Sequence, residues 1–188
     1  MSDVTQTLQE LSGVFDRMGL EYVVIGGIAV RAYAIPRPTF DIDFTVAIPR
    51  DRLFELFRDT ERLGYSVAES YQQGWVDTVA KMPLVKIRCY LQGQGVDVDI
   101  FLAENAFQRA MLERRQLVET GDGTVWIASP EDVILLKLLA SRPRDLLDVQ
   151  DILFTQGELD RPYMFRWADQ LDLNDHLKAA LRKADEQI

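Results

Sequence analysis

The sequence predicts an α/β fold in which a mixed β-sheet is flanked by helices and followed by a C-terminal helical layer. Strand-like apolar runs alternate with amphipathic helical segments through residues 1–128. Hairpin-type breaks separate three consecutive strand-like runs, and residues 129–188 carry helical periodicity with short breaks. At 188 residues, 47% of them hydrophobic, the chain is long enough to bury one substantial core. We therefore expect a core over residues 1–128 and a helical subdomain over residues 129–188 that packs on it.

The first predicted elements are a helix, a strand, a second helix and a second strand. Apolar residues at helical spacing define the first helix, and Gly19 ends it. Gly26 and Gly27 separate the first strand from the second helix, and Pro36 and Pro38 force an extended loop after it. The last segment alternates polar and apolar residues, which is typical of a strand with two different faces. The four ranges are Val4–Met18, Tyr22–Ile25, Ile28–Ala34 and Asp41–Ile48.

The middle of the chain adds one helix and four strand-like runs. Pro83 and the run Gln92–Gly95 separate the three central runs in the manner of hairpins. This pattern favours a mixed or antiparallel sheet over an all-parallel one. The predicted helix is Arg50–Leu63, and the predicted strands are Thr78–Met82, Val85–Leu91, Val96–Leu102 and Thr124–Ala128.

The C-terminal residues are predicted to form four helices. Ser129 has the character of a capping residue, and Pro130 suits the first helical position after it. The ranges are Pro130–Ala140, Pro143–Phe154, Arg161–Gln170 and Asn174–Glu186.

The composition argues against several classes of protein. The longest apolar runs fall well short of the ~20 residues that span a bilayer. The first ten residues lack the basic and apolar segments of a signal peptide, so we expect a cytoplasmic location and no membrane partner. A single cysteine excludes an intramolecular disulfide. The net charge of −9 argues against a general nucleic-acid-binding surface.

Two small basic clusters interrupt the acidic composition. One contains Arg109, Arg114 and Arg115, and the other contains Arg142 and Arg144. We interpret both as solvated helix faces. The alternative is a local groove that meets a polyanionic substrate.

Two aspartates on one strand face are the first candidates for chemistry. Asp41 and Asp43 stand two residues apart, which places their Cα atoms about 7 Å from each other on the same side of a strand. Such a pair is tolerable with solvent, a basic partner or a bound cation. Carboxylates of this kind suit Mg²⁺, which takes one or two of them plus phosphate oxygens. The alternative is an exposed edge strand with two solvated aspartates.

The neighbouring sequence favours the binding interpretation. Gly26 and Gly27 at a strand-to-helix junction present backbone N–H groups and a helix N-terminus to a phosphate, although a tight turn also needs glycine. Further aspartates, Asp97 and Asp99, alternate on another apolar strand. Aspartate is depleted in strands, so its repeated appearance there indicates a site.

The order of these features resembles the nucleotidyltransferase superfamily, typified by DNA polymerase beta and the antibiotic nucleotidyltransferases. The run Arg37-Pro38-Thr39-Phe40-Asp41-Ile42-Asp43 is similar to the signature of the AbiEii-like abortive-infection toxin branch. The later residues Ser129-Pro130-Glu131-Asp132, Lys137 and Arg142–Asp148 are similar to the helical segment that follows the core in that branch. The resemblance covers about residues 20–155.

The resemblance implies roles for individual residues. A glycine turn, here Gly26 and Gly27, holds the triphosphate, although Gly27 lacks the serine hydroxyl of the common superfamily form. A strand pair, here Asp41 and Asp43, binds two metal ions, Mg²⁺ or Mn²⁺. A third carboxylate completes the metal site and helps to deprotonate the attacking hydroxyl. The family spacing assigns it to Asp99, three apolar residues ahead of a polar turn.

Three further residues are candidates for phosphate binding. Arg37 pairs with the strand aspartates in the empty protein or reaches triphosphate oxygens in the loaded one. Thr39 contributes to the phosphate site or braces its loop. Lys137 lies in a mostly apolar helix and either escapes to solvent or points at phosphate, which we favour. We interpret Asp145 and Asp148 as structural partners of the Arg142 and Arg144 pair.

The resemblance implies a metal-dependent enzyme that moves a nucleoside monophosphate from an NTP to an acceptor hydroxyl and releases pyrophosphate. The acceptor class stays open among RNA, protein and small molecules, and the toxin branch suggests an antitoxin protein as a partner. One alternative is an antibiotic-modifying enzyme, which the negative charge permits. Another is an inactive domain of the same fold that binds a nucleotide or a partner protein.

Overall fold

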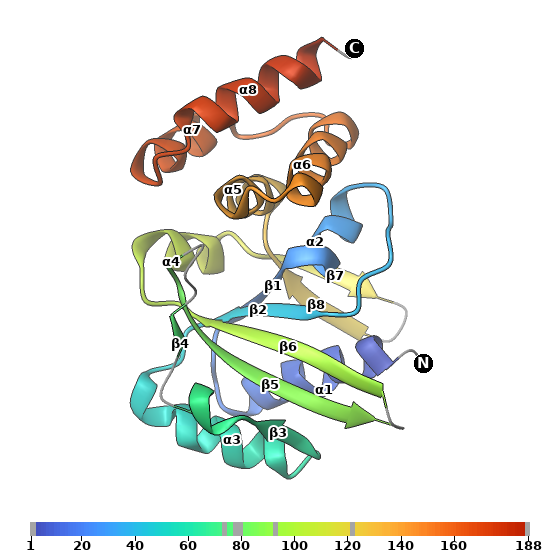
Figure 1. The fold of residues 1–188 in the computed structure, drawn as a ribbon, viewed down its shortest axis with the longest axis vertical. Coiled ribbons are helices and arrows are strands. Elements are labelled where there is room, and N and C mark those ends of the chain that lie inside the picture. Colours follow the sequence, from blue (N-terminus) through green and yellow to red (C-terminus); the bar gives the residue numbers. More distant parts are fainter. Residues whose placement is uncertain (1–2, 73–74, 77–80, 92–93, 121–122, 187–188) are drawn as a thin grey trace.

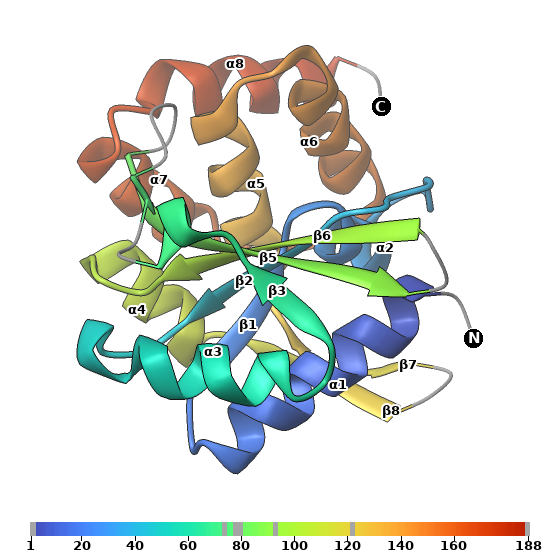
Figure 2. The same cartoon turned by 60° about the horizontal axis from the view of Figure 1, so that its bottom comes forward.

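The computed structural model of the chain describes residues 3–72, 75–76, 81–91, 94–120 and 123–186. It contains an eight-stranded mixed sheet with helices on both faces (Figures 1 and 2), which confirms the predicted α/β fold class. No helix in these ranges has the length and apolar character needed to cross a membrane.

The sheet has the strand order β3-β5-β6-β2-β1-β8-β7, with β4 paired to β5. The pairs β2–β6 and β1–β8 are parallel, and the other described pairs are antiparallel. Strands β1 and β2 are consecutive strands in the sequence, with α2 between them, and they are neighbours near the centre of the sheet. The strands are β1 Tyr22–Ile25, β2 Ile42–Val46, β3 Tyr65–Val67, β4 Trp75–Val76, β5 Pro83–Leu91, β6 Gln94–Leu102, β7 Gln116–Thr120 and β8 Gly123–Ile127.

The helices lie on both sides of this sheet, with α1 and α3 below it and α2, α5 and α6 above it in Figure 1. Short 3₁₀ turns, Arg50–Arg52 and Glu69–Tyr71, precede α3 and β4. The helices are α1 Asp3–Arg17, α2 Gly26–Tyr33, α3 Leu53–Glu61, α4 Ala106–Glu113, α5 Pro130–Ala140, α6 Pro143–Thr155, α7 Arg161–Gln170 and α8 Asn174–Asp185.

Strand β2 separates the core from the site through its alternation. Ile42, Phe44 and Val46 are fully buried. The ring of Phe44 packs edge-on against Phe15 of α1, with centroids 5.1 Å apart. Burial of such a side chain stabilises the fold by roughly 1.5–3 kcal/mol. Because side chains alternate along a strand, Asp43 points to the opposite face, toward the C-terminal helices.

Helix α5 is buried on most of its surface, because α2 contacts it from the sheet side and α6, α7 and α8 contact it from the other side. The predicted start of this helix is confirmed. Ser129 accepts a hydrogen bond from the backbone N–H of Asp132, and Pro130 occupies the first turn. The division into a core and a helical subdomain stays a prediction.

Several boundaries differ from the prediction. Gly26 and Gly27 are the first residues of α2 rather than a turn before it. The predicted strand Thr78–Met82 falls mostly on residues 77–80, outside the described ranges, and β5 begins at Pro83. Sequence patterns also missed β3, β4 and β7. These strands are short or polar and lie at the margins of the sheet, where pairing with a neighbour decides the structure.

Candidate functional site

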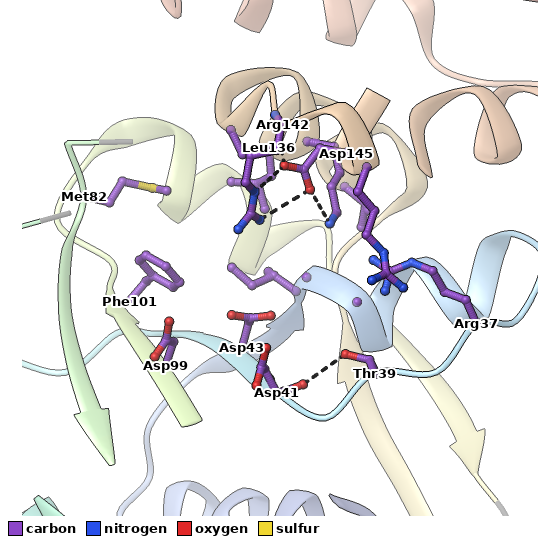
Figure 3. Close-up of a pocket in the computed structure, with 17 residues that line it drawn as sticks. Arg37, Thr39, Asp41, Asp43, Met82, Asp99, Phe101, Leu136, Arg142 and Asp145 are labelled. Carbon is purple, nitrogen blue, oxygen red and sulfur yellow. Dashed lines mark hydrogen bonds and ion pairs between the residues drawn. The ribbon is translucent and has the colours of Figure 1, made fainter. Parts of the chain in front are cut away.

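Three carboxylates from the sheet side, Asp41, Asp43 and Asp99, line one cavity of about 440 Å³ above the sheet, and Asp145 lines it from α6. Asp43 of β2 and Asp99 of β6 are directly paired in the parallel register, and Asp41 immediately precedes β2. Figure 3 shows these three side chains together at the base of the cavity. Asp97 makes an ion pair with Arg88 at 3.1 Å and does not line this cavity. The sheet register therefore places Asp99 beside Asp43, and the lining of the cavity includes Asp99 and not Asp97.

The electrostatics of the site favour a bound cation. Burial, together with the negative charges of Asp99 and Asp41, raises the pKa of Asp43 to about 6. Burial also raises the pKa of Asp99, although an ion pair with Lys86 at 3.0 Å opposes the shift. A positive ion between these groups would relieve the repulsion, so the arrangement fits a divalent metal.

The geometry of the described residues limits how such a metal is held. Among them, no group of three or more His, Cys, Asp or Glu side chains is arranged as a ready-made metal cluster. Mg²⁺ commonly uses only one or two carboxylates and completes its shell with water and substrate phosphate. Asp43 with one neighbouring aspartate therefore provides enough protein ligands for this ion, with the remaining positions left to the substrate.

Gly26 brings the backbone against the carboxylates. Its φ of +66° is a conformation that L side chains rarely adopt. A Cβ atom built at this position would lie 1.9 Å from Oδ2 of Asp43. The site therefore requires glycine here for two independent reasons, the backbone conformation and the space that the carboxylate occupies.

Gly27 has a different neighbour. A Cβ atom at this position would lie 2.6 Å from Oγ1 of Thr39, and that hydroxyl donates a 3.4 Å hydrogen bond to the backbone oxygen of Asp41. Thr39 thus packs the loop onto the start of α2. No side chain caps the N-terminus of α2 at Ile25, so its first N–H groups suit an anion.

A chain of ion pairs forms the opposite side of the cavity. Lys137 of α5 is buried, and its Nζ lies 2.8 Å from Asp145 and 2.9 Å from Asp148, both on α6. Arg142 pairs with Asp145 at 2.6 Å. Burial alone would raise the pKa of Asp145 and Asp148, but hydrogen bonds from the cations outweigh it and hold both values below their usual range. Lys137 lines the cavity without escaping to solvent.

Arg37 lies in this chain of charges and not on the strand aspartates. Its guanidinium makes a two-point contact with Asp148, at 2.8 Å and 2.7 Å. The predicted pairing with Asp41 or Asp43 in the empty protein is therefore wrong, because the guanidinium binds the buried carboxylate of Asp148 on α6 instead. The partnership of Asp145 with Arg142 is as predicted, whereas Asp148 takes Arg37 and Lys137 instead.

Sequence reasoning missed part of the lining. Arg142 and Arg144, interpreted as a solvated face, both line the cavity. An apolar wall also contributes, with Met82 and Phe101 on one side of the carboxylates and Leu136 above them (Figure 3). The apolar periodicity of these segments marked them as core and carried no signal of a binding site.

The fold is shared with solved nucleotidyltransferase structures. An antigenic nucleotidyltransferase-like protein from Paracoccidioides brasiliensis aligns at 18% identity and a TM-score of 0.56, over 94% of this chain and 91% of that one. The lincosamide antibiotic adenylyltransferase LnuA, bound to lincomycin, aligns at 15% identity and 0.51, over 77% and 92%. ANT(2″)-Ia in complex with adenylyl-2″-tobramycin aligns at 17% identity and a TM-score of 0.50, over 100% of this chain and 99% of that one. No curated protein matches the chain.

The family comparison agrees with the fold. The sequence matches the family described as nucleotidyltransferase of unknown function (DUF6036) over residues 1–173. The predicted membership of the nucleotidyltransferase superfamily is confirmed, and the particular likeness to the abortive-infection branch stays a resemblance. A match across nearly the whole chain, together with the paired aspartates beside the glycine-led helix, shows that the chain belongs to this nucleotidyltransferase family.

Proposed function

We propose that the protein is a metal-dependent enzyme that transfers a nucleoside monophosphate from an NTP to an acceptor hydroxyl and releases pyrophosphate. The observation that carries this proposal is the meeting of Asp43 and Asp99 on adjacent strands, against the glycine at the start of α2, in one cavity. The cavity has an acidic floor, a basic side and an apolar wall, which match the metal, phosphate and base of a nucleotide.

The chain's own residues would position the nucleotide. The N–H groups at the start of α2, which no side chain caps at Ile25, would bind the triphosphate, and Gly26 and Gly27 leave room for its approach. Lys137 and Arg142 add positive charge from the other side of the cavity. Because both cations are already held by carboxylates of α6, they are fixed in place before the nucleotide arrives.

In the transfer step, the acceptor oxygen attacks the α-phosphorus of the NTP. A bond forms between these atoms, the bond from the α-phosphorus to the bridging oxygen breaks, and pyrophosphate leaves with the electron pair. Asp99, whose pKa is raised by burial, accepts the proton of the acceptor hydroxyl. Divalent metal would be held by Asp43 with Asp41 or Asp99 and by substrate oxygens, and it would supply charge stabilisation for the transferring phosphoryl group.

Modification of a small-molecule antibiotic is the second candidate function. LnuA and ANT(2″)-Ia share the fold and are described with an antibiotic or its adenylylated product, and the net charge of −9 would attract a cationic drug. The toxin role and the antitoxin partner rest on the sequence resemblance alone.

The test combines a binding assay with a transfer assay. Mg²⁺ or Mn²⁺ with an NTP should raise the melting temperature, because a ligand that binds only the folded protein stabilises it. The double variant Asp41→Asn/Asp43→Asn should stay folded and lose this rise. Each labelled NTP is then incubated with cell extract, and label is followed into RNA, protein and small molecules. A folded protein whose melting temperature responds to no metal and NTP combination would refute the proposal.

A further inference from the structure

A second cavity adjoins the nucleotide site at Asp99. Its volume is about 360 Å³, and it lies over strands β3, β5 and β6. Asp99 lines both cavities, whereas Lys86 of β5 lines only the second of the two. The register places Asp43, Asp99 and Lys86 in one row across three neighbouring strands. The second cavity therefore begins where the proposed acceptor hydroxyl must approach Asp99.

The charges in this second cavity are matched in pairs. Lys86 Nζ lies 3.0 Å from Oδ1 of Asp99, and Arg88 Nε lies 3.1 Å from Oδ1 of Asp97. Each pair stands directly opposite in the antiparallel register of β5 and β6. The side chain of Lys86 is 44% exposed, compared with 23% for Asp99. The ammonium group thus reaches solvent and is not locked in place by burial.

A metal ion held by Asp99 would repel the ammonium group of Lys86, because both are positive, and this repulsion would weaken the net attraction that holds Lys86 beside Asp99. If Asp99 takes part in the proposed metal site, the other charged residues among the described lining of the second cavity are Lys86, Arg88 and Asp97. The local charge then becomes positive beside the position of the acceptor hydroxyl. Such a site attracts an anion and disfavours a polycation.

We propose that Lys86 leaves Asp99 when metal and NTP bind, and that it then binds a phosphate group next to the acceptor's hydroxyl. This inference rests on the proposed function. The acceptor is therefore a phosphorylated compound and not a polycationic drug. A nucleic-acid 3′ end and a small sugar phosphate both offer this chemistry. Half-buried Tyr71 also lines the cavity, and aromatic rings are common stacking partners for bases, so the test includes both sources.

The experiment measures binding of two probes in the presence of Mg²⁺ and a non-hydrolysable NTP. The probes are a short, fluorescently labelled single-stranded RNA with a free 3′ hydroxyl, and ribose 5-phosphate. Lys86→Ala should weaken binding of at least one probe roughly tenfold, the value of a hydrogen bond to a charged group. If RNA is the source, the slope of log K against log salt concentration should also become shallower by about 0.7, which corresponds to one phosphate contact on a single strand. Arg50→Ala is the control, because Arg50 is 50% exposed, pairs with Glu104 and lies outside the second cavity.

A second readout separates a change of partner from a structural role. Without Lys86 as a competitor for Asp99, the rise in melting temperature with NTP should need less Mg²⁺ than in the wild type, while probe binding weakens. A lysine that merely supports the fold would weaken both responses together. Loss of RNA binding alone, or of sugar-phosphate binding alone, supports the inference and identifies the source.

Two outcomes overturn the inference and spare the nucleotide site. One is that Lys86→Ala binds both probes like the wild type while Mg²⁺ and NTP still raise the melting temperature. The other is that the loaded wild type binds neither probe but binds an aminoglycoside, more tightly still when Lys86 is replaced. If the wild type shows no response to Mg²⁺ and NTP, the proposed function fails, and the inference that rests on it fails as well.

Discussion

Replacing Asp43 by asparagine should stabilise the free protein while destroying its response to ligand. Burial and two neighbouring carboxylates disfavour the ionised form of Asp43, so its pKa rises from 3.8 to about 6. Asparagine has the same shape and no charge, so near neutral pH the variant avoids the cost of holding that charge against Asp99. The same change removes a ligand from the proposed metal site.

The raised pKa sets the magnitude of the stabilisation. A difference of about two in pKa corresponds to ~3 kcal/mol in favour of the neutral form. Asp43 is partly exposed, and solvent screens the interaction, so we expect roughly 1–2 kcal/mol. For a chain of this size, that change raises the melting temperature by roughly 2–8 °C.

The pKa shift also predicts how the stability difference between the wild type and Asp43→Asn changes with pH. At pH values well below 3.8, Asp43 is protonated in both the folded and the unfolded chain and contributes no difference. As the pH rises from 3.8 to about 6, the folded protein gives up this proton less readily than the unfolded chain, and the wild type loses stability relative to the variant. Asp132, whose pKa burial also raises to about 6, contributes the same trend to both proteins.

Thermal and urea unfolding in the presence of a chelator, near pH 4 and near pH 7, measure the difference between the two proteins. The control is Asp172→Asn, which removes the same charge from an exposed residue whose positive φ both amino acids tolerate. The reasoning is refuted if Asp43→Asn is less stable than the wild type near pH 7, or if its advantage is as large near pH 4.

Three further substitutions test the site and its surroundings. Gly26→Ala should destabilise the protein and remove its response to Mg²⁺ and NTP. The control Gly19→Ala should keep the response, because Gly19 has a similar φ of +65° but no atom lies within 4 Å of the added Cβ. Equal losses in the two variants would leave backbone strain as the whole explanation. Asp148→Asn should lower the free energy of unfolding, measured in urea, by ~3 kcal/mol, because the buried Lys137 and the half-buried Arg37 both lose a charged partner. A change below ~0.5 kcal/mol would contradict the importance of the ion-pair chain. Asp99→Asn should reduce the transfer rate ~10²-fold with a smaller effect on NTP affinity, and Asp97→Asn should stay active; the opposite pattern would assign the third carboxylate to the other residue.

Local patterns in the sequence were sufficient for much of the fold. Alternation in β2 predicts that Phe44 and Asp43 face opposite sides, and Ser129 predicts the start of α5. The missed strand β7, Gln116–Thr120, shows where such patterns fail. It is a polar strand at the end of the sheet, and its structure depends on the antiparallel pairing with β8.

Part of the candidate site could likewise be predicted from local patterns, and part depends on the pairing of distant strands. From the sequence alone, Asp41, Asp43 and the glycines before them form a candidate phosphate and metal site, because all of these residues are close along the chain. The choice between Asp97 and Asp99 needs a family spacing or a sheet register, and the pairing of β2 with β6 places Asp99 opposite Asp43. The catalytic roles of these residues stay predictions.

The sequence by itself determined which residues carry charge, which face of β2 is apolar and where a well-capped helix such as α5 begins. Only the tertiary structure decided which charges meet. Lys137 pairs with Asp145 and Asp148 because α5 packs against α6, and Lys86 reaches Asp99 because β5 lies beside β6. Periodicity arises from residues a few positions apart, so it can be read from one segment of the sequence. The partner in a long-range ion pair depends on how two distant segments pack, and the local pattern of either segment does not contain that information.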